Sequence, residues 1–324
     1  MSTVDLNSTT VETTRSTKSR YRPHQSGLNV ISRPWDFAFM LLIGIFSLFI
    51  LIPMALVVIV SFSSELSITK VGFSFTPTEW TLDGYKYLFR VGDQLLNSYL
   101  VTIFHSIVGT LMAMAVMTLY SYVLAQRRFR FRLFYTWILF FTMLFGGGLV
   151  PTYILNTRYL GIGDSIWIFL LPGLVSAYNV IILRTFINST IPDTLFEAAR
   201  IDGAGHWRIF FSVVLPLFKA GIATIGLFQI VGRWNNWFTG MLYIQKPHLI
   251  PLQTMLMKIQ QTIDFLKQNS ELANTPDGLR LLRELPNQNL RMATTVIVIL
   301  PIIFAYPFFQ RYFVTGLTVG SVKG

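Results

Sequence analysis

Apolar stretches and polar segments alternate along the whole chain. Six of the apolar stretches are long enough to cross the hydrocarbon core of a bilayer as a helix, which takes about 20 residues. The predicted spans are residues 37–62, 98–124, 134–155, 166–187, 217–238 and 292–314. We therefore expect an all-α, polytopic membrane protein with six transmembrane helices.

The polar segments define the rest of the predicted organisation. Residues 1–35 are expected to form a basic, disordered tail followed by an interfacial segment. Residues 36–315 are expected to form the six-helix domain, and residues 316–324 a separate C-terminal tail. Residues 239–290 form a long loop in which apolar residues from Leu252 to Leu266 follow helical spacing, so this loop is predicted to carry an amphipathic helix.

Two of the predicted spans contain residues that weaken helices. Span 3 carries Gly146-Gly147-Gly148 followed by Pro151, and each glycine costs about 1 kcal/mol relative to alanine. Irregular backbone at membrane depth is tolerated only inside protein or along a watery cavity. We expect this stretch either to line a path or to pack closely on another helix. In span 4, Pro172-Gly173 predicts a kink.

Composition and charge support a membrane location. Of the 324 residues, 52% are hydrophobic and 13% are charged, which excludes a typical soluble domain. The formal net charge of +11 would suggest nucleic acid in a soluble protein. Here basic residues flank the spans, with four arginines within Arg127–Arg132, so we expect no nucleic-acid partner and place this cluster and both termini in the cytoplasm. No short apolar stretch with a cleavage site precedes span 1, so we expect no cleaved signal peptide.

The connection between spans 4 and 5, residues 190–216, has a distinct local pattern. Pro192 and Asp193 suit the first turn of a short helix. Gly203 is predicted to end that helix with a positive φ, because glycine alone adopts the left-handed cap conformation without penalty. A second short helix is predicted from Gly205 to Leu215, with Pro216 leading into span 5. The elbow presents a surface of small residues: Ala198, Ala199 and Ala204.

This connection reads E-A-A-x-x-D-G-A-x5-F-x4-L-P, which resembles the cytoplasmic coupling loop of binding-protein-dependent ABC importer permeases. In that family the short helix docks on the ATP-hydrolysing subunit. The positions that match and are implied to couple to the ATPase are Glu197, Ala198, Ala199, Asp202, Gly203, Ala204, Leu215 and Pro216. Ala220 departs from the pattern, because many relatives carry proline there. The alternative is an ordinary loop helix between two spans.

Further motifs resemble carbohydrate-importer permeases, and the nearer likeness is to the branch that serves complex or acidic oligosaccharides, including the alginate importer. The matching segments are residues 147–153, 171–173, 184–186, 231–238 and 251–253. The ending from Tyr312 to Gly324 resembles the tail of the second permease in maltose-type importers, where the tail reaches into the ATPase dimer interface. This likeness implies ATPase contacts for Gly320, Ser321 and Lys323.

The resemblance implies a type I ABC importer permease fold in the bacterial cytoplasmic (inner) membrane, in contact with membrane lipid. It implies four kinds of partner: a homologous second permease, two ATPase subunits, an external or periplasmic solute-binding protein and an oligosaccharide substrate. ATP and Mg²⁺ would bind to the ATPase subunits. This chain lacks a G-x4-G-K-[ST] loop and has no cysteine, and its four histidines are scattered, so we expect no cofactor, no metal site and no enzymatic activity of its own.

Polar and aromatic residues gather at the outer part of span 5 and suggest a carbohydrate path. Sugars need flat apolar surfaces for their C–H faces and amide or guanidinium donors for their hydroxyls. The candidates are Gln229, Arg233, Trp234, Asn235 and Asn236, together with Tyr153 from the first of the carbohydrate motifs. The alternative is an interfacial aromatic belt with ordinary helix-end polar residues.

Arg233 lies about one helical turn inside Trp237, and span 5 supplies no acid to pair with it. A charge at membrane depth needs a partner or a wet cavity, and a guanidinium can grip a carboxylate with two hydrogen bonds. We therefore predict that Arg233 faces the translocation path and favours anionic oligosaccharides. The alternative is that Arg233 bonds carbonyls of the broken span 3 and stabilises the wall.

A secondary carrier or channel is the second functional hypothesis. A carrier is expected to show internal repeats and paired intramembrane acids for ion coupling. The predicted spans contain almost no acidic residues, and a carrier leaves the coupling elbow unexplained. We therefore expect an importer permease.

Overall fold

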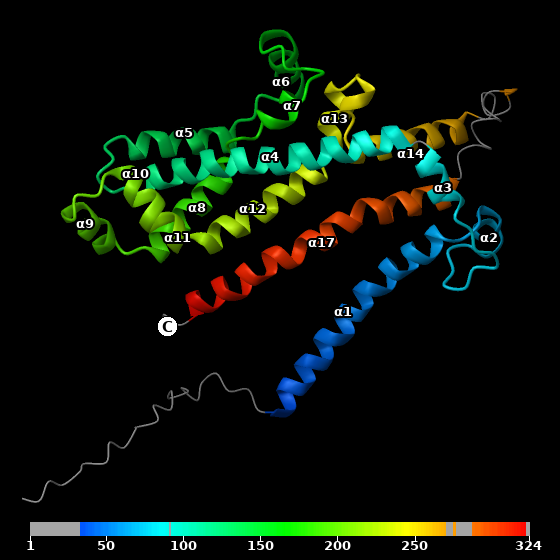
Figure 1. Ribbon diagram of the computed structural model, residues 1–324, viewed down its shortest axis with the longest axis horizontal. Helices are drawn as coiled ribbons and strands as arrows, with labels where there is room; N and C mark the ends of the chain where they lie inside the picture. Colours follow the sequence, from blue (N-terminus) through cyan, green and yellow to red (C-terminus); the bar gives the residue numbers. More distant parts are fainter. Residues whose placement is uncertain (1–32, 91, 270–274, 277–286, 322–324) are drawn as a thin grey trace, which may run out of the picture. The chain divides into compact units, whose positions relative to one another are not determined.

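A computed structural model describes residues 33–90, 92–269, 275–276 and 287–321 (Figure 1). Residues 1–32 and Lys323 lie outside the described residues, so the predictions for the basic tail and for Lys323 find no structural counterpart. Within the described residues, regular structure is helical, with one isolated antiparallel bridge between Ser63 and Trp80. The predicted all-α class is confirmed.

The first half of the chain contains helices that differ greatly in length. They are α1 (Arg33–Ser61), α2 (Glu65–Val71), α3 (Asp83–Arg90), α4 (Gly92–Ala125), α5 (Arg132–Leu144), α6 (Leu149–Ile154), the π-helix η1 (Leu155–Tyr159), α7 (Trp167–Leu170) and α8 (Ala177–Thr190).

The second half begins with short segments and ends with a long helix. These are α9 (Asp193–Ile201), α10 (His206–Ile209), the π-helix η2 (Phe210–Val214), α11 (Leu215–Leu217), α12 (Lys219–Trp234), α13 (Trp237–Tyr243), the 3-10 helix η3 (Pro247–Leu249), α14 (Leu252–Gln268) and α17 (Asn287–Ser321).

Six continuous membrane helices are not confirmed. Among the described residues, two helices are long and apolar enough to cross a membrane, Trp35–Ser61 within α1 and Gly92–Ala125. The count rises to four if each of two bent pairs is one span: Arg132–Leu144 with Leu149–Tyr159, bent by 113°, and His206–Leu217 with Lys219–Trp234, bent by 79°. Hydropathy predicted the apolar stretches, but it did not show how far the helix-weakening residues break them.

The breaks in spans 3 and 4 fall at glycines that the sequence singled out, whereas the 79° bend falls at Phe218. Between α5 and α6 the chain leaves the helix at Phe145, and Gly148 has φ +82° immediately before α6. Span 4 is interrupted rather than kinked: α7 ends at Leu170, Gly173 has φ +83°, and α8 begins only at Ala177. Glycine is the residue that adopts such positive φ values without strain.

Helix α17 also differs from its prediction, because it is longer at both ends than residues 292–314. It continues to Ser321, so Gly320 and Ser321 belong to a helix rather than to a separate tail. Span 5, by contrast, is shorter than predicted. Helix α12 ends at Trp234, and the Asn236 side chain accepts a hydrogen bond from the backbone N–H of Thr239 to cap α13.

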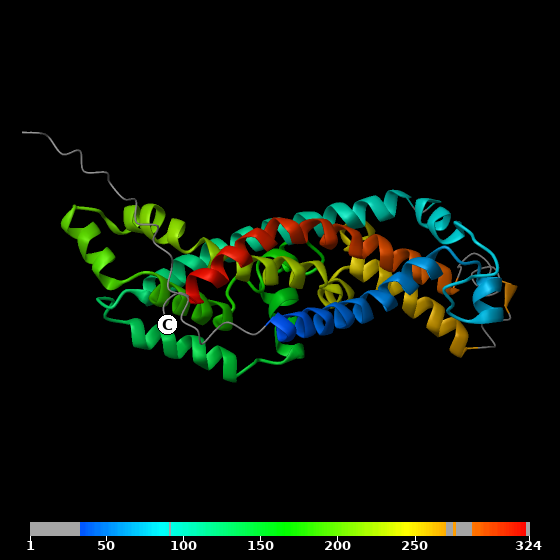
Figure 2. The same cartoon turned by 90° about the horizontal axis from the view of Figure 1, so that it is seen from below.

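Contacts divide the chain into two units, residues 1–52 and 53–324. Within the first unit, the described side chains of residues 35–52 are exposed. In the second unit, α12 packs against both α4 and α17, while α8 packs against α4 (Figures 1 and 2). The largest buried cluster includes Met117 of α4, Leu183 of α8 and Ile225 of α12. Helix α4 is therefore the axis on which the second unit is assembled.

Different elements gather at the two ends of α4. Helices α3 and α14 contact it beside its N-terminal end, whereas α9 and α10 lie near its C-terminal end (Figure 1). The predicted amphipathic helix is confirmed as α14, with Leu252 and Met255 buried and Phe265 exposed. Nearby, the Glu65 carboxylate accepts hydrogen bonds from the backbone N–H groups of Gln288 and Asn289, which complements the positive N-terminus of α17.

Candidate functional site

The elbow between α8 and α12 is built around a glycine cap. Helix α9 ends at Ile201, and Gly203 follows with φ +76°. The Gly203 N–H donates to the Arg200 carbonyl at 3.0 Å, and the Ala204 N–H donates to the Ala199 carbonyl at 2.9 Å. These two bonds form the Schellman motif that ends helices at a left-handed residue. The predicted positive φ of Gly203 is confirmed.

The predicted second helix of the elbow is present as one continuous helical run, His206–Leu217, with a π-helical segment in its middle. Helix α10 passes into the π-helix η2 and then α11, and Phe218 separates α11 from α12. A π turn widens the helix and shifts the faces of the residues around it. Phe210 and Val214 are buried in the core, whereas Trp207 and Phe211 are exposed and stacked on each other at 6.1 Å.

The small residues of the elbow do not form one exposed surface. Ala199 and Ala204 are partly buried and pack against the core, so the prediction of a shared small-residue surface is wrong for them. Glu197 and Ala198 are exposed, and Ile201 is 86% exposed. Positions 197, 198 and 201 lie on one helical face. The sequence motif alone did not show that Ile201 shares an exposed face with Glu197 and Ala198.

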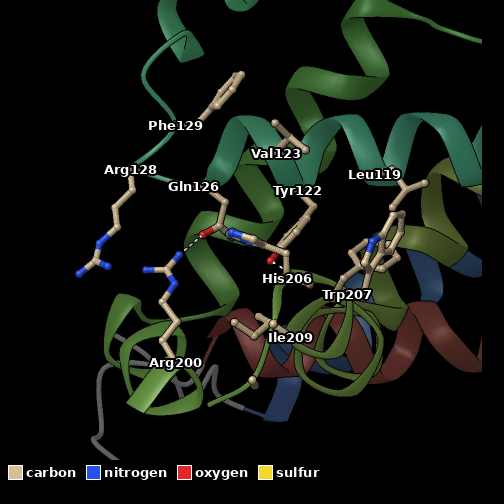
Figure 3. Close-up of a pocket in the computed structure, with 13 residues that line it drawn as sticks. Leu119, Tyr122, Val123, Gln126, Arg128, Phe129, Arg200, His206, Trp207 and Ile209 are labelled. Carbon is tan, nitrogen blue, oxygen red and sulfur yellow. Dashed lines mark hydrogen bonds between the residues drawn. The ribbon is translucent and has the colours of Figure 1, made fainter. Parts of the chain in front are cut away.

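The two residues that directly follow α4 contact the two ends of α9. The Gln126 side-chain oxygen accepts a hydrogen bond from Arg200 at 2.6 Å (Figure 3). The Arg127 guanidinium lies 2.8 Å from the Asp193 carboxylate. In the sequence, Arg127 stood out only as part of the basic cluster that indicates topology, and no pattern pointed to Gln126. We call these contacts the α4–α9 clamp; they connect α9 directly to the helix at the centre of the second unit.

The buried half of the clamp is expected to matter more for order than the exposed half. Gln126→Ala removes a hydrogen bond to a charged group, which contributes about 1.5–3 kcal/mol, so hydrogen exchange of the α9 amides should accelerate at least about tenfold. Arg127→Ala is the matched control, because an exposed ion pair contributes roughly 0–1 kcal/mol. Unchanged exchange in Gln126→Ala, or a larger effect from Arg127→Ala, would contradict the clamp.

Arg233 is buried against backbone carbonyls of the interrupted span 4. Its side chain is buried, with 9% exposed, and it donates to the carbonyls of Phe169 at 2.6 Å and Gly173 at 3.3 Å. These carbonyls were freed by the interruption of span 4, not of span 3 as the structural alternative had it. A nearby break in a helix thus supplies acceptors for this buried cation, as the structural alternative proposed for another span. That Arg233 faces the translocation path stays a prediction.

The other candidates for the substrate path lie in separate surroundings. The Trp234 indole N–H donates to the Val298 carbonyl at 3.2 Å, so this ring is fixed against α17. Asn235 is exposed and its side-chain oxygen accepts from Gln253 at 3.2 Å. Tyr153 is stacked on Tyr243 at 5.4 Å. Gln229 is half-buried and Asn236 caps α13.

The part of the chain that the structure describes was compared with what a metal-binding site requires. Within those residues, no group of three or more His, Cys, Asp or Glu side chains is placed to hold a metal ion. His105, the histidine inside α4, is buried and stacked on Phe169 at 4.8 Å.

Comparison with known proteins places this architecture among membrane transport components. The sequence model of the family described as "Binding-protein-dependent transport system inner membrane component" matches residues 129–319. Two similar proteins come from Bacillus subtilis (strain 168). The polygalacturonan/rhamnogalacturonan transport system permease protein YtcP is 36% identical over 86% of this chain and 94% of its own length. Protein LplC is 34% identical over 90% of this chain and 96% of its own.

A solved structure has the same fold. It is described as a bacterial ABC transporter involved in the import of the acidic polysaccharide alginate, and one of its chains is 30% identical to this one. The match covers 88% of this chain and 99% of that chain, with a TM-score of 0.72. The interrupted helices described above therefore belong to a type I ABC permease fold.

Proposed function

Because the chain belongs to the family of binding-protein-dependent transport system inner membrane components, we propose that it forms half of the translocation path of an ATP-driven oligosaccharide importer. Its relatives are permease components of sugar ABC importers, which are transport subunits rather than enzymes, and its apolar helices agree with a multi-pass membrane location. Six spans, with both termini in the cytoplasm, are part of the proposal.

The exposed face of α9 is the observation that carries the proposal. Glu197, Ala198 and Ile201 present a carboxylate, a small side chain and an apolar side chain on one side of a short helix. The glycine cap and the α4–α9 clamp fix that helix to the unit. An ATPase subunit docked on this face would pull on α4 through the clamp, so nucleotide-driven movement would reach the membrane helices. The partners of the proposed importer are a second permease, two ATPase subunits that bind ATP and Mg²⁺, and an external solute-binding protein.

Acidic oligosaccharides are the proposed cargo. The similar proteins include a polygalacturonan/rhamnogalacturonan permease and a chain of an alginate importer. Polygalacturonan and alginate are both polymers of uronic acids. On this chain, Tyr153 offers a partly exposed ring, while Asn235 and Gln253 offer exposed or partly exposed amides, groups that suit sugar faces and hydroxyls. Arg233 is not assigned to the cargo, because its side chain is buried and two of its guanidinium nitrogens donate to backbone carbonyls.

Reversing the charge at Glu197 tests the docking assignment. Glu197→Lys is expected to leave the permease pair assembled but to abolish ATP-driven uptake in reconstituted vesicles, because a lysine would repel the basic partner that an exposed acid on a docking helix requires. The matched control is Asp264→Lys, a charge reversal at an exposed acid of α14. Normal uptake by Glu197→Lys would contradict the proposal that an ATPase subunit docks on this face of α9.

A further inference from the structure

A cavity of about 660 Å³ lies between the last turns of α4 and the elbow (Figure 3). Its volume falls in the range of small-molecule sites, about 300–1,000 Å³. One side carries the guanidinium groups of Arg128 and Arg200, and the other carries Leu119 and Trp207. The cavity is therefore amphipathic, with cations at one end and apolar side chains at the other.

The cationic end lacks a counter-charge. None of the described residues that line the cavity is acidic, and Arg128 has no ion-pair partner within the described part of the chain. One Arg200 nitrogen donates to Gln126, and the remaining guanidinium donors stay available to a ligand. A guanidinium pair of this kind favours an oxyanion such as a phosphate, which can accept hydrogen bonds from both groups.

Gln126 supplies an independent sign of a missing ligand. Its side chain is only 8% exposed and lines the cavity. Its oxygen is used by Arg200, but its side-chain nitrogen is buried without a hydrogen-bond partner within the described residues. A buried donor that lacks an acceptor costs about 1–3 kcal/mol. A phosphate oxygen held by the two arginines would satisfy it.

The position of the cavity identifies the source of the phosphate. It lies along Leu119, Tyr122 and Val123 in the last two turns of α4 and Gln126 just after them, and α4 is long and apolar enough to cross a membrane. The arginine-rich segment follows at once, and such segments mark the level of lipid headgroups. We propose that this cavity binds one anionic phospholipid, with its phosphate at Arg128, Arg200 and Gln126 and its acyl part beside Leu119 and Trp207.

The proposed lipid and the proposed ATPase use different sides of the elbow. The lipid cavity is bounded by Arg200, Ala204 and α10, whereas the docking face carries Glu197, Ala198 and Ile201. A lipid held here would fix the clamp, because Gln126 and Arg200 belong to both. The proposal rests only on the membrane location of the chain, so it can fail or succeed apart from the proposed function.

Fluorescence quenching by brominated lipid tests the site in the assembled permease pair, in nanodiscs and without ATP. The Trp207 signal is the difference between the pair and its Trp207→Phe variant. Brominated phosphatidylglycerol is expected to quench this signal more strongly than brominated phosphatidylcholine at equal mole fraction. Arg128→Gln should weaken the apparent affinity for phosphatidylglycerol about fivefold, since one arginine contributes about 1 kcal/mol near anionic lipid. Arg128→Lys should retain most of it.

Arg130→Gln is the matched control, because Arg130 belongs to the same basic segment but does not line the cavity. Equal quenching by the two lipids, no quenching by either, or an equal loss in Arg130→Gln would overturn the site. Displacement of the brominated lipid by soluble glycerol phosphate at matched phosphate concentration would also overturn it, because the ligand would then be a soluble phosphate ester.

Discussion

Arg233→Ala is expected to lower the unfolding temperature of the assembled permease pair by about 2 °C or more. The change removes the charged donors of two carbonyls, those of Phe169 and Gly173. A hydrogen bond to a charged group contributes about 1.5–3 kcal/mol, and 1 kcal/mol corresponds to about 0.7 °C for two chains of this length, at an unfolding entropy of about 2.1 cal/mol/K per residue. Arg291→Ala is the control, because Arg291 is exposed on α17. Equal melting of the two variants would contradict the packing role of Arg233.

Gly109 offers an independent test of the same arginine. A Cβ atom at this position would lie 2.5 Å from an Arg233 guanidinium nitrogen, so Gly109→Ala must displace the guanidinium from its acceptors. Gly232→Ala is the matched control, since its Cβ would meet no atom within 4 Å. In the Arg233→Ala background, Gly109→Ala should become nearly neutral, because the group that it displaces is gone. Additive effects would show that Gly109 acts elsewhere.

Gly203→Val is expected to reduce ATP-driven uptake about 5- to 30-fold. Valine at φ +76° pays a left-handed penalty of roughly 1–2 kcal/mol, which shifts the population of the correctly formed elbow by that factor. Gly205→Ala is the control: Gly205 has φ −71° and its Cβ would meet no atom within 4 Å. Uptake by Gly203→Val equal to that of the control would show that the elbow geometry does not set coupling.

Features fixed by local chemistry were predicted well from the sequence. The glycine cap at Gly203 and the amphipathic pattern of α14 need only their own neighbours in the chain, so both predictions are confirmed. The glycines of span 3 also marked a true break. What they did not show was its size, because a bend of 113° depends on how the flanking helices pack rather than on the weak residues themselves.

Features that depend on distant partners were missed or misassigned. The acceptors of Arg233 lie 64 and 60 residues away along the chain, and they are free only because span 4 is interrupted. The Gln126–Arg200 bond joins residues 74 positions apart. Ala199 and Ala204 fit the coupling motif by sequence, but tertiary packing turned them towards the core. The spacing of residues along one sequence does not show which distant residues meet in the folded chain.

ATP-dependent uptake of a defined oligosaccharide tests the central claim most directly. The complex of this chain with its second permease, ATPase subunits and binding protein would be reconstituted into vesicles and supplied with galacturonan oligosaccharides or with a neutral glucan of equal length. We predict that the vesicles take up the acidic oligosaccharide only when ATP is present on the side of the membrane that carries the ATPase subunits. This uptake should persist when ion gradients across the membrane are collapsed. Uptake that continues without ATP and stops when the ion gradient is removed would contradict the account, because it would identify a secondary carrier.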